Sequence, residues 1–259
     1  MKYCLLARDT DRSNEVANYI KANVKLEYDE NIPDIVVAIG GDGTILKASH
    51  QYPNAVIFGI HTGHLGFYAN YSADDLETIV SDIHSRNYKI DALDILETTF
   101  KDRNGRTYTD FAMNEVTIVC PPRTLRLDVY IDNEYFERFR GTGFAISTPS
   151  GSTGYNKSLD GSVVDTSLSV MQLTEIAGIN SNAYRTLSSP LILSSERTIR
   201  LEASEKGSDV FITVDHISYQ IDQFECISVK YKKNALKMAY RNHESFLTRI
   251  NRTFIISKE

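Results

Sequence analysis

The stretch VVAIGGDGTILKASH, residues 36–50, carries the pattern that decides the fold. A continuous run of apolar, largely β-branched residues ends at Gly40 and Gly41, and residues 44–52 are compatible with a helix. A buried strand that leads through glycines into a helix is typical of an open α/β sheet, which binds ligands beyond the carboxyl ends of its strands. Backbone amides exposed in such a loop bind phosphate.

Asp42 is the unexpected residue of this loop, because a carboxylate repels phosphate on direct contact. The loop matches neither GxxxxGK[ST] nor GxGxxG, so the two best-known phosphate loops are excluded. Asp42 suits a place beside a divalent cation, or beside a substrate hydroxyl that loses its proton during phosphoryl transfer. The structural alternative is a tight turn with aspartate as a turn residue.

The flanking segments extend the α/β pattern. Short apolar runs predict buried strands, and amphipathic stretches alternate with them and predict helices, the first with its N-cap at Ser13. This alternation predicts a doubly wound α/β unit. The predicted strands are 2–7, 34–40 and 54–60, and the predicted helices are 13–24, 44–52 and 73–85.

The pattern changes near residue 90, where apolar and polar residues begin to alternate between turn signals such as IDNE (131–134). We predict an antiparallel, β-sandwich-like domain that is interrupted by one helix at 163–178. No Pro- or Gly-rich linker separates the halves, so we expect them to pack together with the ligand site in the cleft between them. The predicted divisions are an α/β domain, a mainly β domain, and a C-terminal segment that packs back on the α/β domain (1–90, 91–235 and 236–259).

Composition narrows the function classes. The net charge is −6, which disfavours a protein that holds nucleic acid by its backbone, and we interpret the basic segment 230–252 as a solvated helix face. The three cysteines have neither metal-ligand spacing nor an even disulfide count. The N-terminus has no apolar core of a signal peptide, and no stretch approaches the ~20 apolar residues of a membrane span. We therefore expect a cytoplasmic protein.

Two shorter stretches contain candidate binding residues. Phe67 and Tyr68 follow the third predicted strand and suit an aromatic wall against a flat ring, or else the core. Asn114 and Glu115 break the alternation of their strand. An amide and an ionised carboxylate together match vicinal hydroxyls such as those of a ribose, although an edge-strand pair that faces water is equally compatible.

The longest unusual stretch is FRGTGFAISTPSGSTGYNKSLDG, residues 139–161. It contains five glycines and many hydroxyl side chains, and the strand-like FAIST and Pro149 favour an ordered ligand loop over a flexible tether. Arg140 suits bidentate pairing with phosphate, or a solvent-facing position on its strand. Asp215 and His216 close another strand and are candidates for the same cleft, or a surface pair.

In this order, GGDGT, HTGHLGFYA, the NE pair, RFRG, STPSGSTGYN and VDH resemble the motifs of the bacterial NAD kinases over nearly the whole chain. GGDGT alone also occurs in lipid and sugar kinases. The resemblance implies transfer of the terminal phosphate of ATP, or of polyphosphate, to the 2′-hydroxyl of the adenosine ribose of NAD, with Asp42 as general base. It also implies a divalent cation, with Mg²⁺ expected, and a dimeric or tetrameric assembly.

The resemblance assigns nucleotide-binding positions residue by residue. In the α/β half these are Asp42, Gly43, Lys47, Phe67 and Tyr68. In the β half they are Asn114, Glu115, Arg140, Thr142, Ser150, Thr153, Gly154, Tyr155, Asn156, Lys157, Ser158, Ala177, Asp215 and His216.

This chain also departs from the family pattern at three places. Thr142 stands where an aspartate is common, Gly154 where alanine is usual, and Asp165–Thr166 where a His-Pro pair is usual. These departures motivate the alternative of an NAD(P)-binding sensor without catalysis. A lipid or small-alcohol kinase that shares GGDGT is the other alternative.

Overall fold

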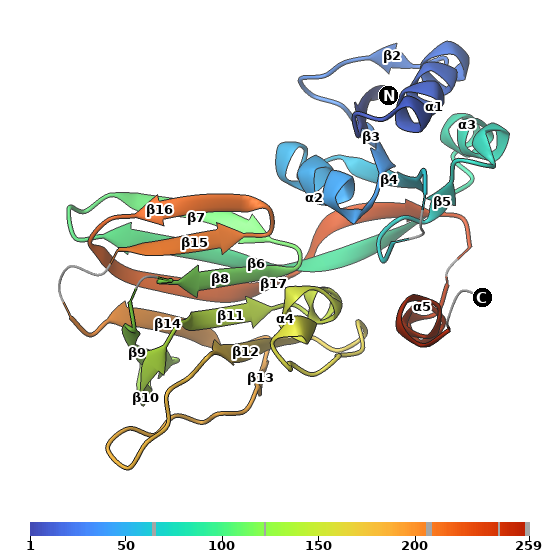
Figure 1. The fold of residues 1–259 in the computed structure, drawn as a ribbon. Coiled ribbons are helices and arrows are strands. Elements are labelled where there is room, and N and C mark those ends of the chain that lie inside the picture. Colours follow the sequence, from blue (N-terminus) through green and yellow to red (C-terminus); the bar gives the residue numbers. More distant parts are fainter. Residues whose placement is uncertain (64–65, 122, 206–208, 243, 257–259) are drawn as a thin grey trace. The chain divides into compact units, whose positions relative to one another are not determined.

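The computed structural model describes residues 1–63, 66–121, 123–205, 209–242 and 244–256. The chain folds into two compact units, one of residues 1–93 with 234–259 and one of residues 94–233. It enters the second unit along β6 (Lys89–Asp102) and returns to the first along β17 (Phe224–Tyr240) (Figure 1).

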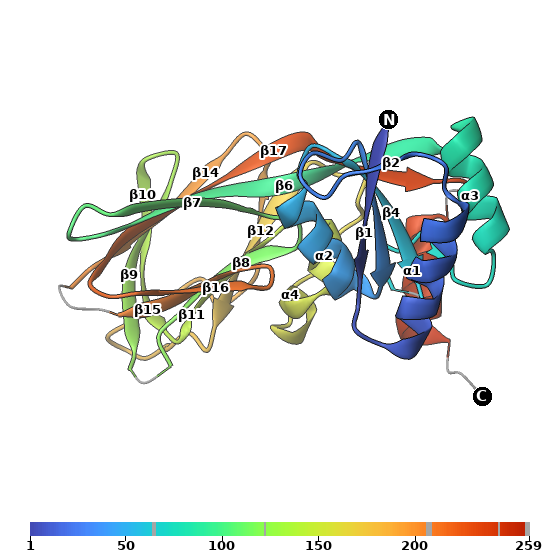
Figure 2. The same cartoon turned by 90° about the horizontal axis from the view of Figure 1, so that it is seen from above.

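The first unit is built on a parallel sheet in the order β17-β4-β3-β1-β2. Helices α1 and α3 cover one face of the sheet and α2 covers the other (Figure 2). This is the predicted doubly wound arrangement. The elements are β1 (Lys2–Ala7), α1 (Asp11–Asn23), β2 (Glu27–Tyr28), β3 (Ile35–Gly40), α2 (Asp42–Gln51), β4 (Val56–His61), β5 (Tyr71–Ser72), α3 (Leu76–Ser85), α5 (Phe246–Ile250) and the π-helical turn η2 (Asn251–Ile255).

Packing explains why the apolar runs form this sheet. β3 is buried along its whole length, as a strand covered by helices on both faces must be. Helix α2 approaches β4 closely because Gly59 has no side chain; a Cβ there would lie 2.7 Å from Cδ1 of Ile45. The predicted N-cap Ser13 is wrong, since Thr10 caps α1 and its hydroxyl accepts the Ser13 amide.

The second unit is an antiparallel β structure with two sheet regions around one core. One sheet has the order β13-β12-β11-β8-β15-β16, and strands β10-β9-β14-β17, with β6 and β7, form the other region. Buried side chains from both regions make a single cluster, as in a sandwich. The further elements are β7 (Thr107–Ala112), β8 (Glu115–Val119), β9 (Leu125–Ile131), β10 (Glu134–Gly141), β11 (Gly143–Ser147), the 3₁₀ turn η1 (Ser150–Thr153), α4 (Tyr155–Ser158), β12 (Val170–Ile176), β13 (Leu191–Ser194), β14 (Thr198–Ala203), β15 (Val210–Val214) and β16 (Ile217–Ile221).

Two predictions for this unit have opposite outcomes. The turn at 131–134 is confirmed, because Asp132 and Asn133 both have positive φ (53° and 68°) between β9 and β10. The helix at 163–178 is wrong. Residues 170–176 form β12, in which Met171 and Leu173 enter the core while Gln172 and Thr174 hydrogen-bond to the loop after α4 and to Asn156 of α4.

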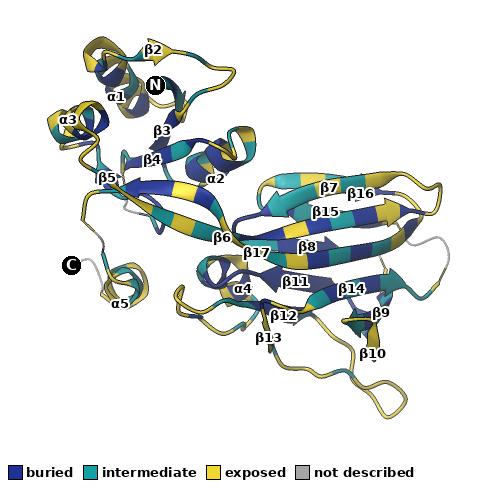
Figure 3. Ribbon diagram, turned by 180° about the vertical axis from the view of Figure 1, so that it is seen from behind, coloured by how far each residue is buried: buried dark blue, intermediate teal, exposed yellow. Residues whose placement is uncertain are grey.

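The interpretation of residues 230–252 as a solvated helix face is also wrong. Residues 230–240 continue β17, in which buried and exposed positions mix along the strand (Figure 3). Arg249 and Arg252 lie in the following helical turns with side chains only 17% and 27% exposed, and both bind backbone carbonyls of the first unit.

Candidate functional site

The Asp42 carboxylate is held by backbone amides of a loop that is distant in sequence. Asp42 opens α2 directly after β3 and Gly41, and it is half-buried. Its Oδ2 accepts the Phe67 amide at 2.8 Å and its Oδ1 accepts the Tyr68 amide at 3.0 Å. Each carboxylate oxygen has further lone pairs, so the two bonds fix the orientation of the group and leave acceptor capacity free.

Gly66 permits this close approach. A Cβ at residue 66 would lie 2.2 Å from Asp42 Oδ1, 2.6 Å from Cγ and 2.7 Å from Oδ2, so any other residue would displace the carboxylate. Gly40, at the end of β3, has φ +156° and leaves no room for a side chain beside Thr44. The GGDGT loop and residues 66–68 therefore form one tightly packed constellation around Asp42.

The remaining candidates of the first unit have different environments. The side chains of Phe67 and Tyr68 are 8% and 5% exposed, and Phe67 packs on Phe254 with ring centroids 6.1 Å apart. Their role as an aromatic wall stays a prediction. The sequence gave no indication that their backbone amides hold Asp42. Gly43 and Lys47 are exposed on α2. His64, in the HTGHLGFYA motif, lies outside the described residues.

Asp215 organises the Asn114–Glu115 pair. It lies in the turn between β15 and β16 with φ +51°. Its Oδ2 accepts the Met113 amide at 2.8 Å, and its Oδ1 accepts the amides of Asn114 and Glu115 at 2.8 and 3.3 Å. Its own amide donates to the Glu115 carbonyl at 3.0 Å. The carboxylate thus fixes the backbone from which both candidate side chains project, and the neighbouring His216 is exposed.

The Glu115 carboxyl lies in a poorly solvated position. Within the described part of the chain, its Oε2 is buried and has no hydrogen-bond partner. Burial, reinforced by the negative charge of Asp215, raises the pKa of Glu115 to about 8, against the opposing effect of the Tyr155 amide. The raised pKa favours the protonated carboxyl, which can donate a hydrogen bond as well as accept one, whereas we expected an ionised acceptor from the sequence.

The glycine- and hydroxyl-rich loop packs directly on this pair. The Thr148 hydroxyl donates to the Met113 carbonyl at 2.7 Å and accepts the Gly151 amide at 2.9 Å. A Cβ at Gly151 would lie 2.0 Å from the Asn114 carbonyl oxygen, and one at Gly154 would lie 3.2 Å from Glu115 Oε2. Both glycines bring the loop within contact distance of the Asn114–Glu115 pair.

The candidate residues of this loop divide into internal supports and accessible groups. The Asn156 side chain is fully buried; it donates to the carbonyls of Ser152 and Ser162 and accepts the Thr174 hydroxyl. Thr153 bonds back to the Ser150 carbonyl. The exposed members are Gly154, Tyr155, Lys157 and Ser158.

A third group lies where β10 and β12 end. The Arg140 guanidinium lies 3.5 Å from the ring centroid of Tyr184, and the Arg140 carbonyl accepts the Ile179 amide at 2.7 Å. The Thr142 amide bonds to the Ile176 carbonyl, and Ala177 is exposed with φ +48°. The sequence gave no signal for Tyr184 as the partner of Arg140.

The charged departure from the family pattern at residue 165 is exposed to solvent. Asp165 is exposed and accepts the Ser167 amide at 2.8 Å, which lowers the pKa of its carboxyl. Among the described residues, no group of three or more His, Cys, Asp or Glu side chains is placed to hold a metal ion. Across the same residues, no helix has the length and apolar character that a membrane crossing requires.

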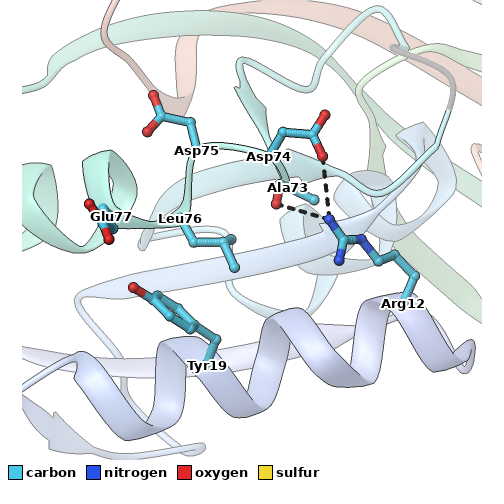
Figure 4. Close-up of a pocket in the computed structure, with 7 residues that line it drawn as sticks. All are labelled: Arg12, Tyr19, Ala73, Asp74, Asp75, Leu76 and Glu77. Atoms are coloured by element: carbon cyan, nitrogen blue, oxygen red, sulfur yellow. Dashed lines mark hydrogen bonds and ion pairs between the residues drawn. The ribbon is translucent and has the colours of Figure 1, made fainter.

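A cavity of about 430 Å³ in the first unit contains none of the candidate residues (Figure 4). Tyr19 and Arg12 of α1 face the segment 73–77 there. The Arg12 guanidinium lies 3.3 Å from Asp74 Oδ1 and 3.4 Å from the Ala73 carbonyl oxygen. This ion pair joins two residues that line the cavity, and no residue of the Asp42 constellation is among those lining it.

The fold and these loops define a class of protein. A doubly wound α/β unit with an acid among glycines at a strand end, and a β unit with a glycine- and hydroxyl-rich loop, are the parts of a nucleotide-dependent phosphotransferase. Comparison with known proteins gives the family. Residues 5–88 match the ATP-NAD kinase N-terminal domain, and residues 113–238 match the ATP-NAD kinase C-terminal domain.

Full-length relatives agree with these matches. The chain is 38% identical to the NAD kinase of Geobacillus stearothermophilus, with 98% of this chain and 96% of that protein covered. It is 36% identical to the NAD kinase of Lysinibacillus sphaericus strain C3-41, with both chains covered completely. The chain therefore belongs to the NAD kinase family.

Solved structures share the fold. A yeast NADH kinase complexed with NADH superposes with a TM-score of 0.85 at 21% identity, covering 100% of this chain and 89% of that one. An NAD kinase from Archaeoglobus fulgidus in complex with ATP gives a TM-score of 0.73 at 22% identity, and the match covers 98% of this chain and 97% of that one.

Proposed function

We propose that this protein transfers the terminal phosphate of ATP to the 2′-hydroxyl of the adenosine ribose of NAD, giving NADP. The observation that carries the proposal is the Asp42 constellation in a chain that is 38% identical over nearly its whole length to an NAD kinase. Asp42 acts as general base: its carboxylate, held by two amides, accepts the proton that the attacking hydroxyl loses.

The Asn114–Glu115 pair binds ribose hydroxyls. The Asn114 amide both donates and accepts, and the protonated Glu115 carboxyl does the same, so the pair satisfies two vicinal hydroxyls in either direction. Asp215 holds the backbone of the pair, and the Tyr155 ring and exposed groups of residues 150–158 contact the nucleotide. Arg140, Thr142, Ala177 and His216 contact the remaining part of the dinucleotide. The further nucleotide-binding residues that we propose in the first unit are Gly43, Lys47, Phe67 and Tyr68.

The residues present fit a nucleotide-borne Mg²⁺ better than a resident metal. No cluster of three potential protein ligands exists among the described residues, and Asp42 keeps free lone pairs on both oxygens. Mg²⁺ bound to the triphosphate, with Asp42 as the protein ligand nearest the reaction, would neutralise phosphoryl charge. The protein is proposed to be cytoplasmic and to work as a homodimer or homotetramer, and polyphosphate is the second candidate donor.

The direct test is to incubate the purified chain with NAD and Mg²⁺ and with either ATP or polyphosphate, and to assay NADP. We expect NADP with ATP, and the relative rates decide the donor. Omission of Mg²⁺ with EDTA present should abolish the reaction. If no NADP forms with either donor while NAD still binds, the sensor alternative replaces the kinase. Phosphorylation of a lipid or a simple alcohol at a higher rate than NAD would favour the other alternative.

A further inference from the structure

The C-terminal segment contacts the loop that holds Asp42. Arg252 Nη2 donates to the Gly66 carbonyl at 3.2 Å, and Arg249 Nη1 donates to the Phe67 carbonyl at 2.9 Å. All these groups belong to the first compact unit. Arg249 and Arg252 follow Gly66 by more than 180 residues in sequence, so the contact is a tertiary feature that no local motif signals.

Each arginine donates to the carbonyl oxygen of a peptide group whose N–H donates to Asp42. The Gly66 carbonyl and the Phe67 amide are two ends of one planar peptide unit, and the Phe67 carbonyl and the Tyr68 amide are two ends of the next. In a trans peptide the C=O and N–H point in opposite directions. Each unit therefore links a guanidinium on its oxygen to the Asp42 carboxylate on its nitrogen.

The arginines are themselves fixed in place. Both oxygens of Glu244 accept Arg252 Nη1, at 2.7 and 2.8 Å, and Glu244 Oε2 lies 3.9 Å from Arg249 Nε. Arg249 Nη2 donates to Asn70 Oδ1 at 3.1 Å. Phe254 of the same segment packs on Phe67. Such partly buried, charge-assisted bonds hold a loop more firmly than surface pairs.

We propose that Arg249 and Arg252 are positioning residues for Asp42, and that they act through the two peptide groups at residues 66–68. A cation on a carbonyl polarises the peptide group and strengthens the hydrogen bond that its N–H donates. The arginines thereby orient and stabilise the carboxylate without touching it or the nucleotide. This inference rests on the proposed role of Asp42 in catalysis.

Amide hydrogen exchange tests the structural half of this inference without any need for activity. In ¹⁵N-labelled protein, the double variant Arg249→Ala/Arg252→Ala should exchange the Phe67 and Tyr68 amides at least about tenfold faster than wild type. The matched control is Arg12→Ala, which also removes an ion-paired arginine of the first unit but lies at the cavity away from residues 66–68. Equal exchange of these amides in the double variant and the wild type would overturn the proposal.

Steady-state kinetics test the functional half. We expect the double variant to lose on the order of 10-fold to 100-fold in kcat, the range that a displaced catalytic group produces, with KM for ATP and NAD within about twofold. Arg249→Lys/Arg252→Lys keeps both charges and one donor nitrogen in place of three, so it should recover part of the loss. Faster exchange with unchanged kcat would overturn the positioning role.

Two further outcomes remain distinguishable. If thermal melting shows that the alanine double variant does not fold, the lysine variant and the single variants provide the same comparison. If the wild-type protein formed no NADP at all, the proposed function would fail, whereas the exchange experiment would still decide whether the arginines hold the Asp42 loop.

Discussion

Replacing Gly66 by alanine should remove most of the activity through one methyl group. The added Cβ would lie 2.2 Å from Asp42 Oδ1, and ordinary van der Waals contact begins at 3.4 Å. Either the carboxylate or the loop must therefore withdraw by about 1.2 Å. A misplacement of about 1 Å in a reacting group costs on the order of 100-fold in rate, or about 2.7 kcal/mol of transition-state stabilisation.

The assay is kcat for NADP formation at saturating ATP and NAD, with the melting temperature measured on the same samples. The matched control is Gly63→Ala in the same loop, since a Cβ at Gly63 would meet no atom of the described residues within 4 Å. The control should keep kcat within about twofold of wild type. A folded Gly66→Ala protein with wild-type kcat would show that the carboxylate does not need this position, and the assignment of Asp42 as base would fall with it.

The other predictions concern the two carboxyls of the second unit and Asp42 itself. Asp42→Asn should lower kcat by at least about 100-fold while NAD binding by calorimetry persists, and an unchanged rate would remove Asp42 from the chemistry. The folded-state pKa of Glu115 is raised to about 8 from 4.5. At pH values between these two, the folded state therefore holds a proton that the unfolded state has lost. Stability should therefore fall as pH rises from about 5 to 8, and Glu115→Gln should reduce that fall by about 1–3 kcal/mol in urea titrations; parallel pH curves would contradict this. Asp215→Asn keeps one acceptor oxygen and Asp215→Ala keeps none, so the free energy of unfolding in urea titrations should decrease in that order, by about 1–3 kcal/mol per orphaned amide.

The sequence predicted the fold class well because its signals are local. The buried run before Gly40 and the amphipathic helix at 76–85 follow from periodicity, and they define the α/β unit. β12 was wrongly included in a helix, although Met171, Gln172, Leu173 and Thr174 alternate apolar and polar side chains as a strand does. Gln172 and Thr174 are buried because Ser162 and Asn156 satisfy them, and side-chain type alone does not reveal such hydrogen bonds.

The candidate residues were found from short motifs, whereas the hydrogen bonds that hold them in place were not. Asp42 and Glu115 lie within recognisable stretches, but the groups that hold them come from far along the chain. The amides at 67 and 68 belong to another loop, Asp215 follows Glu115 by 100 residues, and Arg249 lay in a basic segment that we read as solvent-facing. Side-chain type and spacing carry no information on such tertiary contacts.

The return of β17 to the first unit has a consequence for how this chain folds during its synthesis. Residues 237 and 238 pair with β4 at residues 56 and 57, so the parallel sheet stays incomplete until the ribosome has made the whole second unit. A fragment that stops near residue 93 would leave a hydrophobic strand of that sheet with unpaired backbone groups, and such open strands recruit other chains. We therefore expect the isolated N-terminal fragment to aggregate, and productive folding to await the last β-strand.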